Sequence, residues 1–327
     1  MDGWWDANDL VKFFDKLYAS RAIVEVKSKE YRTLAAAVYA KIVPEGSVKR
    51  SHEVADAHYS IDNDLFQRML DPRMAYSCGV WCYGAKDLTE AQEDKLELIC
   101  RKLRLKPGMT VLEIGCGWGS FAKYASEKYG VHVTGITVSD AQAELAREVC
   151  KGLPVKIEQV DYRKISGQYD RVVSIAMFEA VGKRYINAFF DAMSRYLKED
   201  GIFFLHTIGF FDKEFTVSPW LDKYIFPGSY VPYFDEMGKA LQDRFVVEHY
   251  ENIGAGYAPT LHAWYDNFVA AWPEIKGRYD ERFYRMWVYY LNYCEATFHH
   301  RFSHVWHFVM RKKSAKGAYS FEPLQHR

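Results

Sequence analysis

Residues 110–120 (Thr-Val-Leu-Glu-Ile-Gly-Cys-Gly-Trp-Gly-Ser) constrain the fold more than any other segment of this chain. An apolar pattern typical of a buried strand leads directly into glycines at positions 115, 117 and 119, and a helix-like pattern follows over 121–129. Glycine adopts positive φ angles at little steric cost and lets a ligand approach the bare backbone. Three glycines at alternate positions exceed the needs of a plain strand-to-helix turn, so the segment predicts a ligand cradle.

The glycine spacing also bears on which ligand is bound. A dinucleotide fingerprint reads G-x-G-x-x-G/A, with an acid for the ribose about 20 residues later. Here the pattern is G-x-G-x-G, Ser120 stands where the last small residue belongs, and the next predicted strand ends in Thr137, with Asp140 slightly beyond. These departures disfavour a nicotinamide-dependent dehydrogenase. The spacing instead resembles the first motif of S-adenosylmethionine-dependent methyltransferases.

The composition excludes several classes of partner and site. Lys and Arg number 43 and Asp and Glu also number 43, so no overall field favours a nucleic acid. The spacings of the six cysteines match neither a disulfide framework nor a metal knuckle, so we expect reduced thiols, no metal and a cytoplasmic protein. No signal peptide opens the chain and no apolar run is long enough to span a bilayer, which restricts membrane contact to the surface.

Two basic clusters are candidates for contact with anionic lipid headgroups. One covers residues 21–50, and the other consists of Arg311, Lys312, Lys313 and Lys316. Each cation near such a surface contributes about 1 kcal/mol. A solvated basic surface explains either cluster equally well.

Strands and helices alternate along most of the chain, which predicts an α/β fold with a parallel sheet and helices on both faces. The expected strands are 110–114, 131–137, 155–160, 169–175, 202–208, 244–251 and 304–311. The expected helices are 8–20, 29–42, 89–103, 118–129, 140–151, 183–197 and two within 258–300, with an irregular aromatic stretch at 209–235. Thr89-x-x-Gln92 predicts a capping box at the start of the helix 89–103. Ligands in such folds bind beyond the carboxyl ends of the strands, where the glycines lie.

Further strings then match one family along nearly the whole chain. They are Met1-Asp-Gly-Trp-Trp-Asp6, His58-Tyr-Ser-Ile-Asp-Asn-Asp64, Leu70-Asp-Pro72, Tyr76-Ser-Cys-Gly-Val-Trp81, Thr137-x-Ser139-x-x-Gln142, Met177-Phe-Glu179, Leu205-His-Thr-Ile208, Lys223-Tyr-Ile-Phe-Pro-Gly228 and Ala263-Trp-Tyr265. With these strings the chain resembles the cyclopropane-fatty-acyl-phospholipid synthases, including the mycolic acid cyclopropane synthases.

The resemblance implies a Rossmann-like class I methyltransferase with a mostly parallel seven-stranded sheet. Residues 58–327 would form this domain, with acyl-chain-binding insertions at about 209–300. Residues 1–57 would be a helical segment belonging to a larger N-terminal domain in relatives, so we expect the chain to begin partway through that domain. The implied activity is transfer of a methylene group from S-adenosylmethionine to a cis double bond of an unsaturated phospholipid. Such an enzyme would act peripherally at the inner face of the membrane, with a homodimer as a candidate assembly.

The resemblance also implies the site residues. Those expected at S-adenosylmethionine are Tyr76, Ser77, Gly115 and Gly117 for the methionine part, Thr137 and Gln142 for the ribose, and Asp161 and Tyr162 beside the adenine. Those expected at a bound bicarbonate ion are Cys78, Glu179, His206, Ile208 and Tyr265. Taken singly, Glu179 suits a turn cap and His206 a core position. Both fall at the carboxyl ends of adjacent predicted strands, however, so they should lie together beside the glycine loop.

The implied chemistry requires such a site. Methyl transfer to an alkene leaves a carbocation, and a base must then remove a proton to close the ring. The pocket must be dry, because water would trap the cation, and aromatic walls would stabilise it by ~0.5–2 kcal/mol per contact. A bicarbonate clamped by a carboxyl, an imidazole and a phenol would serve as the base, with the proton relayed outward through Glu179 or His206.

One departure from the family pattern keeps other functions open. A His is expected directly after Met177-Phe-Glu179, but the chain has Ala180. Loss of this imidazole could shift the substrate, slow proton removal or abolish activity. The alternatives are a lipid methyltransferase that leaves a methyl branch or a methylene group, and a non-catalytic relative that binds S-adenosylmethionine or lipid.

Overall fold

The structure is a computed structural model that describes residues 1–20 and 63–327. The helix predicted at 29–42, the basic segment 21–50, the domain boundary at 57/58 and most of the string 58–64 lie outside the described residues.

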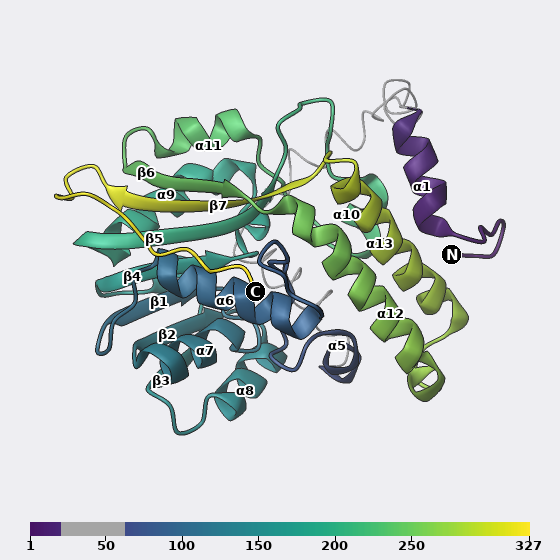
Figure 1. The fold of residues 1–327 in the computed structure, drawn as a ribbon, viewed down its shortest axis with the longest axis horizontal. Helices are drawn as coiled ribbons and strands as arrows, with labels where there is room; N and C mark the ends of the chain where they lie inside the picture. The colour runs from purple at the N-terminus through teal and green to yellow at the C-terminus, as the bar shows by residue number, and fades with distance from the viewer. Residues whose placement is uncertain (21–62) are drawn as a thin grey trace.

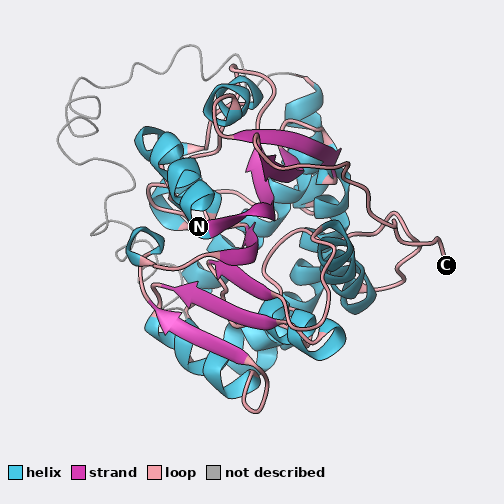
Figure 2. Ribbon diagram, turned by 90° about the vertical axis from the view of Figure 1, so that its left-hand side faces the viewer, coloured by secondary structure: helices cyan, strands magenta, loops and turns pink. Residues whose placement is uncertain are grey.

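One seven-stranded sheet organises the molecule (Figure 2). Its strands, which are labelled in Figure 1, follow the order β3-β2-β1-β4-β5-β7-β6. The strands are β1 (Thr110–Ile114), β2 (His132–Thr137), β3 (Val155–Gln159), β4 (Tyr169–Ile175), β5 (Leu197–Gly209), β6 (Phe245–Asn252) and β7 (His304–Lys312). Neighbours from β3 to β5 pair in parallel, and β7 runs antiparallel between β5 and β6. The predicted mostly parallel seven-stranded sheet is therefore confirmed. Because β7 is reversed, β5 and β6 point the same way and end at the same edge.

Helices cover both faces of this sheet (Figure 1). One face carries α9 (Ile186–Tyr196) and α11 (Phe234–Leu241) over an aromatic core that includes Phe189, Phe190 and Phe203. The other face carries α6 (Leu88–Lys102), α7 (Ser120–Tyr129) and α8 (Asp140–Val149). The odd and even residues of β5 enter different cores, as the two-residue period of a strand requires.

A helical layer lies beyond the carboxyl ends of the parallel strands (Figure 1). It is formed by α5 (Asn63–Met69), α10 (Pro219–Tyr224), α12 (Tyr257–Ile275) and α13 (Glu281–His299), with a core that contains Trp264 and Trp287. The N-terminal helix α1 (Leu10–Ala19) packs on α13 through Phe14 and Tyr18. Short 3₁₀ turns complete the chain: η1 (Tyr162–Lys164), η2 (Phe178–Ala180), η3 (Lys183–Tyr185) and η4 (Gly254–Gly256).

Two local predictions need correction. Helix α6 begins at Leu88 with Asp87 as its N-cap, whose carboxylate accepts a 2.9 Å hydrogen bond from the Glu90 backbone N–H. The capping box predicted at Thr89 is wrong because Asp87 supplies the capping oxygen two residues earlier. The aromatic stretch 209–235, predicted irregular, contains the short helix α10, which Ser218 caps. Among the described residues, no helix combines the length and apolarity needed to cross a bilayer.

Candidate active site

The glycine loop joins β1 to α7 in a left-handed backbone conformation. Gly115 and Gly117 have φ angles of 79° and 53°. A Cβ on Gly115 would lie 2.6 Å from the Cβ of Met177, whereas a Cβ on Gly117 would meet no atom of the described part of the chain within 4 Å. Gly115 is therefore required by packing, and Gly117 leaves open space that a ligand can occupy.

A cavity opens above this loop, and we call it the loop cavity. All eight residues predicted for S-adenosylmethionine line it: Tyr76, Ser77, Gly115, Gly117, Thr137, Gln142, Asp161 and Tyr162. The fold brings them together because the glycine loop follows β1, Thr137 ends β2, and Asp161 follows β3. These strands are adjacent and parallel, so their carboxyl ends share one edge.

Hydrogen bonds hold several of these side chains in place. The Thr137 hydroxyl donates to Oε1 of Gln142 at 2.8 Å, next to the Ser139 N-cap of α8. The Asp161 carboxylate accepts from the backbone N–H and the side chain of Arg163 at 2.9 and 2.7 Å. The pocket wall is thus preorganised by the chain itself, which lowers the entropic cost of binding.

Two charged residues of the loop cavity escaped the sequence analysis. Glu113 is 3% exposed, and within residues 1–20 and 63–327 its Oε2 atom has no hydrogen-bond partner. Burial raises the pKa of Glu113 well above its usual range. Lys95 is 1% exposed and donates to the Ser77 hydroxyl at 2.8 Å, and burial lowers its pKa to about 8. Glu113 could have been noticed as an acid inside an apolar strand just before the glycines.

The loop cavity suits a zwitterionic amino-acid moiety joined to a nucleoside. An unpaired buried carboxyl costs several kcal/mol, and an ammonium group placed beside Glu113 would offset that cost. The Lys95 ammonium favours a carboxylate near Ser77. These donor and acceptor groups fit the methionine part of S-adenosylmethionine.

A second cavity, which we call the aromatic cavity, adjoins the first. Its aromatic lining includes Tyr18, Phe210, Phe226, Tyr257, Tyr290 and Phe298, and it also contains Glu179 and Ile208. Tyr76, Ala176 and Ala180 line both cavities. The Tyr76 hydroxyl lies 2.8 Å from that of Tyr290, which ties this shared wall to α13. The two cavities are therefore neighbours that share one wall.

Glu179 brings a buried acid into the aromatic cavity. Its Oε1 accepts hydrogen bonds from the Ile208 backbone N–H at 2.5 Å and from the Thr207 hydroxyl at 3.1 Å. Its Oε2 is buried and has no hydrogen-bond partner among the described residues. Burial raises the pKa of Glu179, which favours a protonated carboxyl that can donate through Oε2. The backbone of Ile208 is therefore engaged with Glu179, and its side chain lines the cavity.

Cys78 and His206 are both fully buried, and neither is among the described residues that line the loop cavity or the aromatic cavity. The Cys78 thiol donates to the Gly79 carbonyl at 3.3 Å, and burial raises its pKa. Nδ1 of His206 lies 3.0 Å from Nε2 of His307, and burial lowers the pKa of His206 well below its usual range. Since residues two apart share one face of a strand, His206 lies on the same face of β5 as Ile208.

Tyr265 is not brought to the aromatic cavity. On α12 the buried positions are 260, 261, 264, 268 and 275. Tyr265 is turned about 100° from Trp264 toward the side of His262, whose ring centroid is 6.3 Å away. Tyr257 opens α12 and lines the cavity instead. Burial first, then Cys78, raises the pKa of Tyr257 well above its usual range.

Tyr257 reaches this position because it follows β6 and η4 in the chain. β6 ends at the same edge as β5, and η4 then packs closely on the segment that carries Cys78. A Cβ on Gly256 would lie 2.6 Å from the Gly79 carbonyl oxygen. Positions 257, 261, 264 and 268 follow helical spacing, which places Tyr257 on the buried face of α12. The sequence could reveal this only if the helix was known to begin at residue 257.

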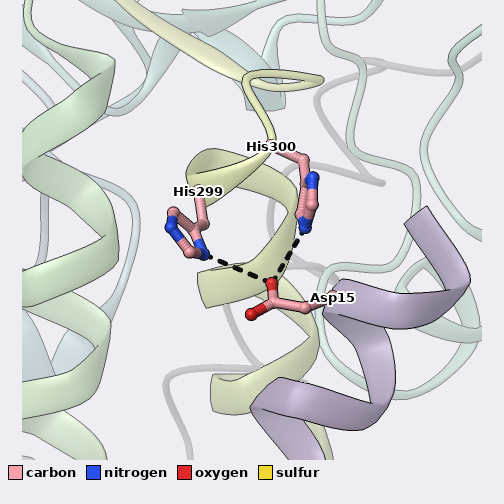
Figure 3. Close-up of side chains that lie close together, drawn as sticks. All are labelled: Asp15, His299 and His300. Atoms are coloured by element: carbon pink, nitrogen blue, oxygen red, sulfur yellow. Dashed lines mark hydrogen bonds and ion pairs between the residues drawn. The ribbon is translucent and has the colours of Figure 1, made fainter. Parts of the chain in front are cut away.

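A cluster of Asp15, His299 and His300 ties α1 to α13 (Figure 3). Oδ1 of Asp15 lies 3.3 Å from Nδ1 of His299 and 3.0 Å from Nε2 of His300. The three ligand-type atoms lie within 4.8 Å of one another. Tyr18 extends from the same helix into the aromatic cavity, so this cluster holds one wall of that cavity.

In the C-terminal basic cluster, Arg311 and Lys312 make contacts within the protein. Arg311 is 7% exposed and donates to the carbonyls of Gly317 and Lys316 at 2.8 and 2.6 Å. Lys312 lies 3.7 Å from Glu199. Arg311 is therefore a structural residue, while Lys313 and Lys316 are exposed.

Comparisons with known proteins agree with this geometry. A family model described as mycolic acid cyclopropane synthetase matches residues 46–308. The chain is 44% identical over 317 residues to the cyclopropane-fatty-acyl-phospholipid synthase of Escherichia coli K12, and the match covers 97% of this chain and 82% of that protein. The chain belongs to the cyclopropane synthase family that this model describes. It is an S-adenosylmethionine-dependent methyltransferase, as predicted.

Solved structures extend the comparison to the fold. The cyclopropane synthase MmaA2 from Mycobacterium tuberculosis is 28% identical with a TM-score of 0.76, covering 80% of this chain and 98% of that one. Mycolic acid cyclopropane synthase CmaA1, complexed with SAH and CTAB, is 31% identical with the same TM-score of 0.76 and the same coverage. These neighbours confirm the predicted class I methyltransferase fold. The roles of the individual site residues stay predictions.

Proposed function

We propose that this enzyme transfers a methylene group from S-adenosylmethionine to the cis double bond of an unsaturated phospholipid acyl chain and forms a cyclopropane ring. The observation that carries the proposal is the junction of the two cavities at Tyr76, Ala176 and Ala180. A polar cavity suited to a charged nucleoside there meets an apolar, aromatic cavity suited to an acyl chain. The E. coli relative, named a cyclopropane-fatty-acyl-phospholipid synthase, supports the same substrate class.

The residues of the aromatic cavity match the needs of this reaction. When bound, S-adenosylmethionine supplies an electrophilic methyl group. The aromatic walls exclude water and stabilise a carbocation on the acyl chain by ~0.5–2 kcal/mol per ring. Tyr76 and Tyr290, joined by their hydroxyls, hold the shared wall in a fixed position, which aligns the two reactants.

We also propose a bicarbonate ion as the base, held near Glu179, His206 and Tyr257. Bicarbonate, when bound, accepts the proton that ring closure releases. Protonated Glu179 and the Tyr257 phenol would donate hydrogen bonds to the anion, which removes the repulsion that an ionised Glu179 would cause. The Cys78 thiol donates its hydrogen bond to the Gly79 carbonyl, so we assign Cys78 a structural role behind this site. Tyr257 takes the place in this proposal that the sequence had suggested for Tyr265.

Peripheral contact with the inner face of the membrane belongs to the same proposal. Trp4 is 91% exposed and Trp5 is 49% exposed, and both precede α1, whose Tyr18 lines the aromatic cavity. Tryptophan is favoured at membrane–water interfaces. Homodimer formation stays a prediction.

Product analysis tests the proposal. The protein is incubated with unsaturated phospholipid vesicles and S-adenosylmethionine, and the released acyl chains are analysed by mass spectrometry and proton NMR. A gain of one methylene group with ring protons and loss of vinyl protons is expected. Retained vinyl protons with a methyl doublet, or an exocyclic methylene, would show the branching alternative. Cofactor binding without product would show a non-catalytic relative.

Glu179→Gln tests the assigned site. We expect this variant to keep its affinity for S-adenosylhomocysteine and to lose turnover by about 10²–10⁴-fold. Tyr257→Phe and Tyr265→Phe form a matched pair, in which only the first should lower turnover. Removal of dissolved carbon dioxide should slow the wild type, and added bicarbonate should restore it. Equal turnover of the two tyrosine variants would contradict the assignment of Tyr257.

A further inference from the structure

A row of titratable side chains crosses three strands beside the active site. In the register of the sheet, Glu251 on β6 lies opposite His307 on β7, and His307 lies opposite His206 on β5. His206 is 1% exposed and His307 is 0% exposed, whereas the Glu251 side chain is 30% exposed. The row therefore runs from the solvent-facing edge strand to the buried imidazole near Glu179.

Lys102 of α6 completes the connection. Its side chain is 0% exposed, and its ammonium group pairs with the Glu251 carboxylate. The same Nζ atom lies 3.0 Å from Nδ1 of His307, and Nε2 of His307 lies 3.0 Å from Nδ1 of His206. Glu251, Lys102, His307 and His206 thus form one continuous hydrogen-bonded chain.

The charge state of Lys102 sets the direction of every bond in this chain. The nearby His249 and the Lys102 charge lower the pKa of Glu251 to about 2, so the carboxylate is ionised. Burial lowers the pKa of Lys102, and its contact with the ionised Glu251 opposes this shift and favours the ammonium form. An ammonium group has three donors and no acceptor, so Nδ1 of His307 must accept. Burial and the nearby Lys102 lower the pKa of His307 well below its usual range, so the ring is neutral. Its single proton is then on Nε2.

The same reasoning applies to the imidazole of His206. Because Nε2–H of His307 donates, Nδ1 of His206 accepts. Burial, Lys95 and Lys102 lower the pKa of His206 well below its usual range, so this ring is also neutral. Its proton is then on Nε2, on the far side of the ring from His307.

The other groups around the chain do not reverse this order. Lys95, also on α6, donates to the Ser77 hydroxyl and to Oε1 of Gln92 at 2.8 and 2.5 Å. His249 of β6 lies 3.9 Å from the Glu251 carboxylate, at the outer end. The Phe321 ring of the C-terminal segment lies 5.8 Å from the Lys102 ammonium and covers it.

We propose that Lys102, paired with Glu251, is a positioning residue that acts through His307 to hold His206 as its Nε2–H tautomer. His206 then donates a hydrogen bond into the active site and does not serve as the base. The inference rests on the proposed function only for the place of His206 in the site. It deepens that proposal by giving each group one role. Glu179, Tyr257 and His206 would all donate hydrogen bonds to the bound bicarbonate, and the bicarbonate would accept the proton released by ring closure.

The tautomer can be measured without turnover. The full chain is labelled with ¹⁵N-histidine, long-range proton–nitrogen correlations are recorded, and His206 and His307 are assigned with His206→Gln and His307→Gln. We expect His206 to carry its proton on Nε2 in the wild type and in the control Lys106→Met, which changes an exposed lysine just after α6. In Lys102→Met, the Nδ1–H tautomer of His206 or His307 should appear.

Two results would overturn the inference: a wild-type His206 protonated on Nδ1, or an unchanged tautomer pattern in Lys102→Met. If Lys102→Met does not fold, the double variant Lys102→Met/Glu251→Gln replaces it, because it removes both charges together. The wild-type spectrum alone still shows whether His206 is protonated on Nε2 or on Nδ1. Turnover gives a separate readout. Lys102→Met should lower kcat by about 10–100-fold and leave the KM for S-adenosylmethionine unchanged. Absence of any lipid product would defeat the proposed function while the tautomer result still stands.

Discussion

Three glycine-to-alanine substitutions separate the folding role of the loop from its binding role. Gly108, Gly115 and Gly117 all have positive φ angles, at 80°, 79° and 53°. An added Cβ would meet nothing within 4 Å at Gly108 and Gly117, but it would lie 2.6 Å from Met177 at Gly115. Gly117 lines the loop cavity, and Gly108 lies in the turn before β1. The three positions therefore share one kind of strain and differ in what surrounds them.

These differences set the expected magnitudes. Left-handed backbone at a non-glycine residue costs about 1–2 kcal/mol, so Gly108→Ala and Gly117→Ala should lower the free energy of unfolding by similar amounts. Gly115→Ala adds overpacking against Met177, at about 1–3 kcal/mol more. Only Gly117→Ala places a methyl group in the space that a ligand occupies, and a loss of about 1.4 kcal/mol or more there means at least a tenfold weaker complex.

Urea unfolding and titration calorimetry with S-adenosylhomocysteine measure the two effects. Gly117→Ala should match Gly108→Ala in stability and bind the ligand at least about tenfold more weakly. If Gly117→Ala binds as tightly as Gly108→Ala, the ligand does not lie against the loop backbone, and the reasoning fails. A Gly115→Ala protein as stable as Gly108→Ala would show that Met177 moves freely.

Three further predictions concern the junction, the cofactor pocket and the N-terminal helix. Ala180→His restores the imidazole expected in the family, and product analysis should show a changed rate or product ratio; an unchanged profile would make the departure neutral. The lowered pKa of Lys95, about 8 against about 10.4 when unfolded, means that the unfolded chain binds more protons between these values. The contribution of Lys95 to the free energy of unfolding should therefore rise between about pH 8 and 10.4. Urea unfolding measures this contribution as the difference in free energy of unfolding between the wild type and Lys95→Met. Affinity for S-adenosylhomocysteine should fall as pH rises through about 8, and Lys95→Met should lack this step. Asp15→Asn should cost at most about 1 kcal/mol of stability and raise the KM for lipid, because Tyr18 of α1 lines the aromatic cavity; an unchanged KM would show that the cluster with His299 and His300 does not support that wall.

The cofactor side of the site was predictable for a physical reason. Apart from Tyr76 and Ser77, which precede the first strand, the residues predicted there end or follow a strand of the parallel part of the sheet or belong to the glycine loop, and parallel strands end at a common edge. Knowledge of the strand order was enough to gather Gly115, Thr137 and Asp161 around one cavity. Lys95 was missed because its helix precedes β1, and its approach to Ser77 depends on how that helix packs.

The acyl side of the site was only partly predictable. Glu179 follows β4 and lines the aromatic cavity, His206 lies near the end of the adjacent strand β5, and Tyr257 lines the cavity where Tyr265 was predicted. Their roles stay predictions. The choice depended on the first residue of α12 and on the direction of β6, and the reversed strand β7 determines that direction. A shift of one residue along a helix turns a side chain by about 100°, so an error in the face of α12 exchanges one tyrosine for another.

The sequence by itself determined the parallel sheet, the glycine cradle and the family, because strand periodicity and glycine spacing are local properties of the chain. Only the tertiary structure decided that the loop cavity and the aromatic cavity share one wall. It also decided that Lys102, His307 and His206 form one hydrogen-bonded chain. These contacts join residues about one hundred to two hundred positions apart, and they depend on strand register and helix packing, which no local pattern encodes.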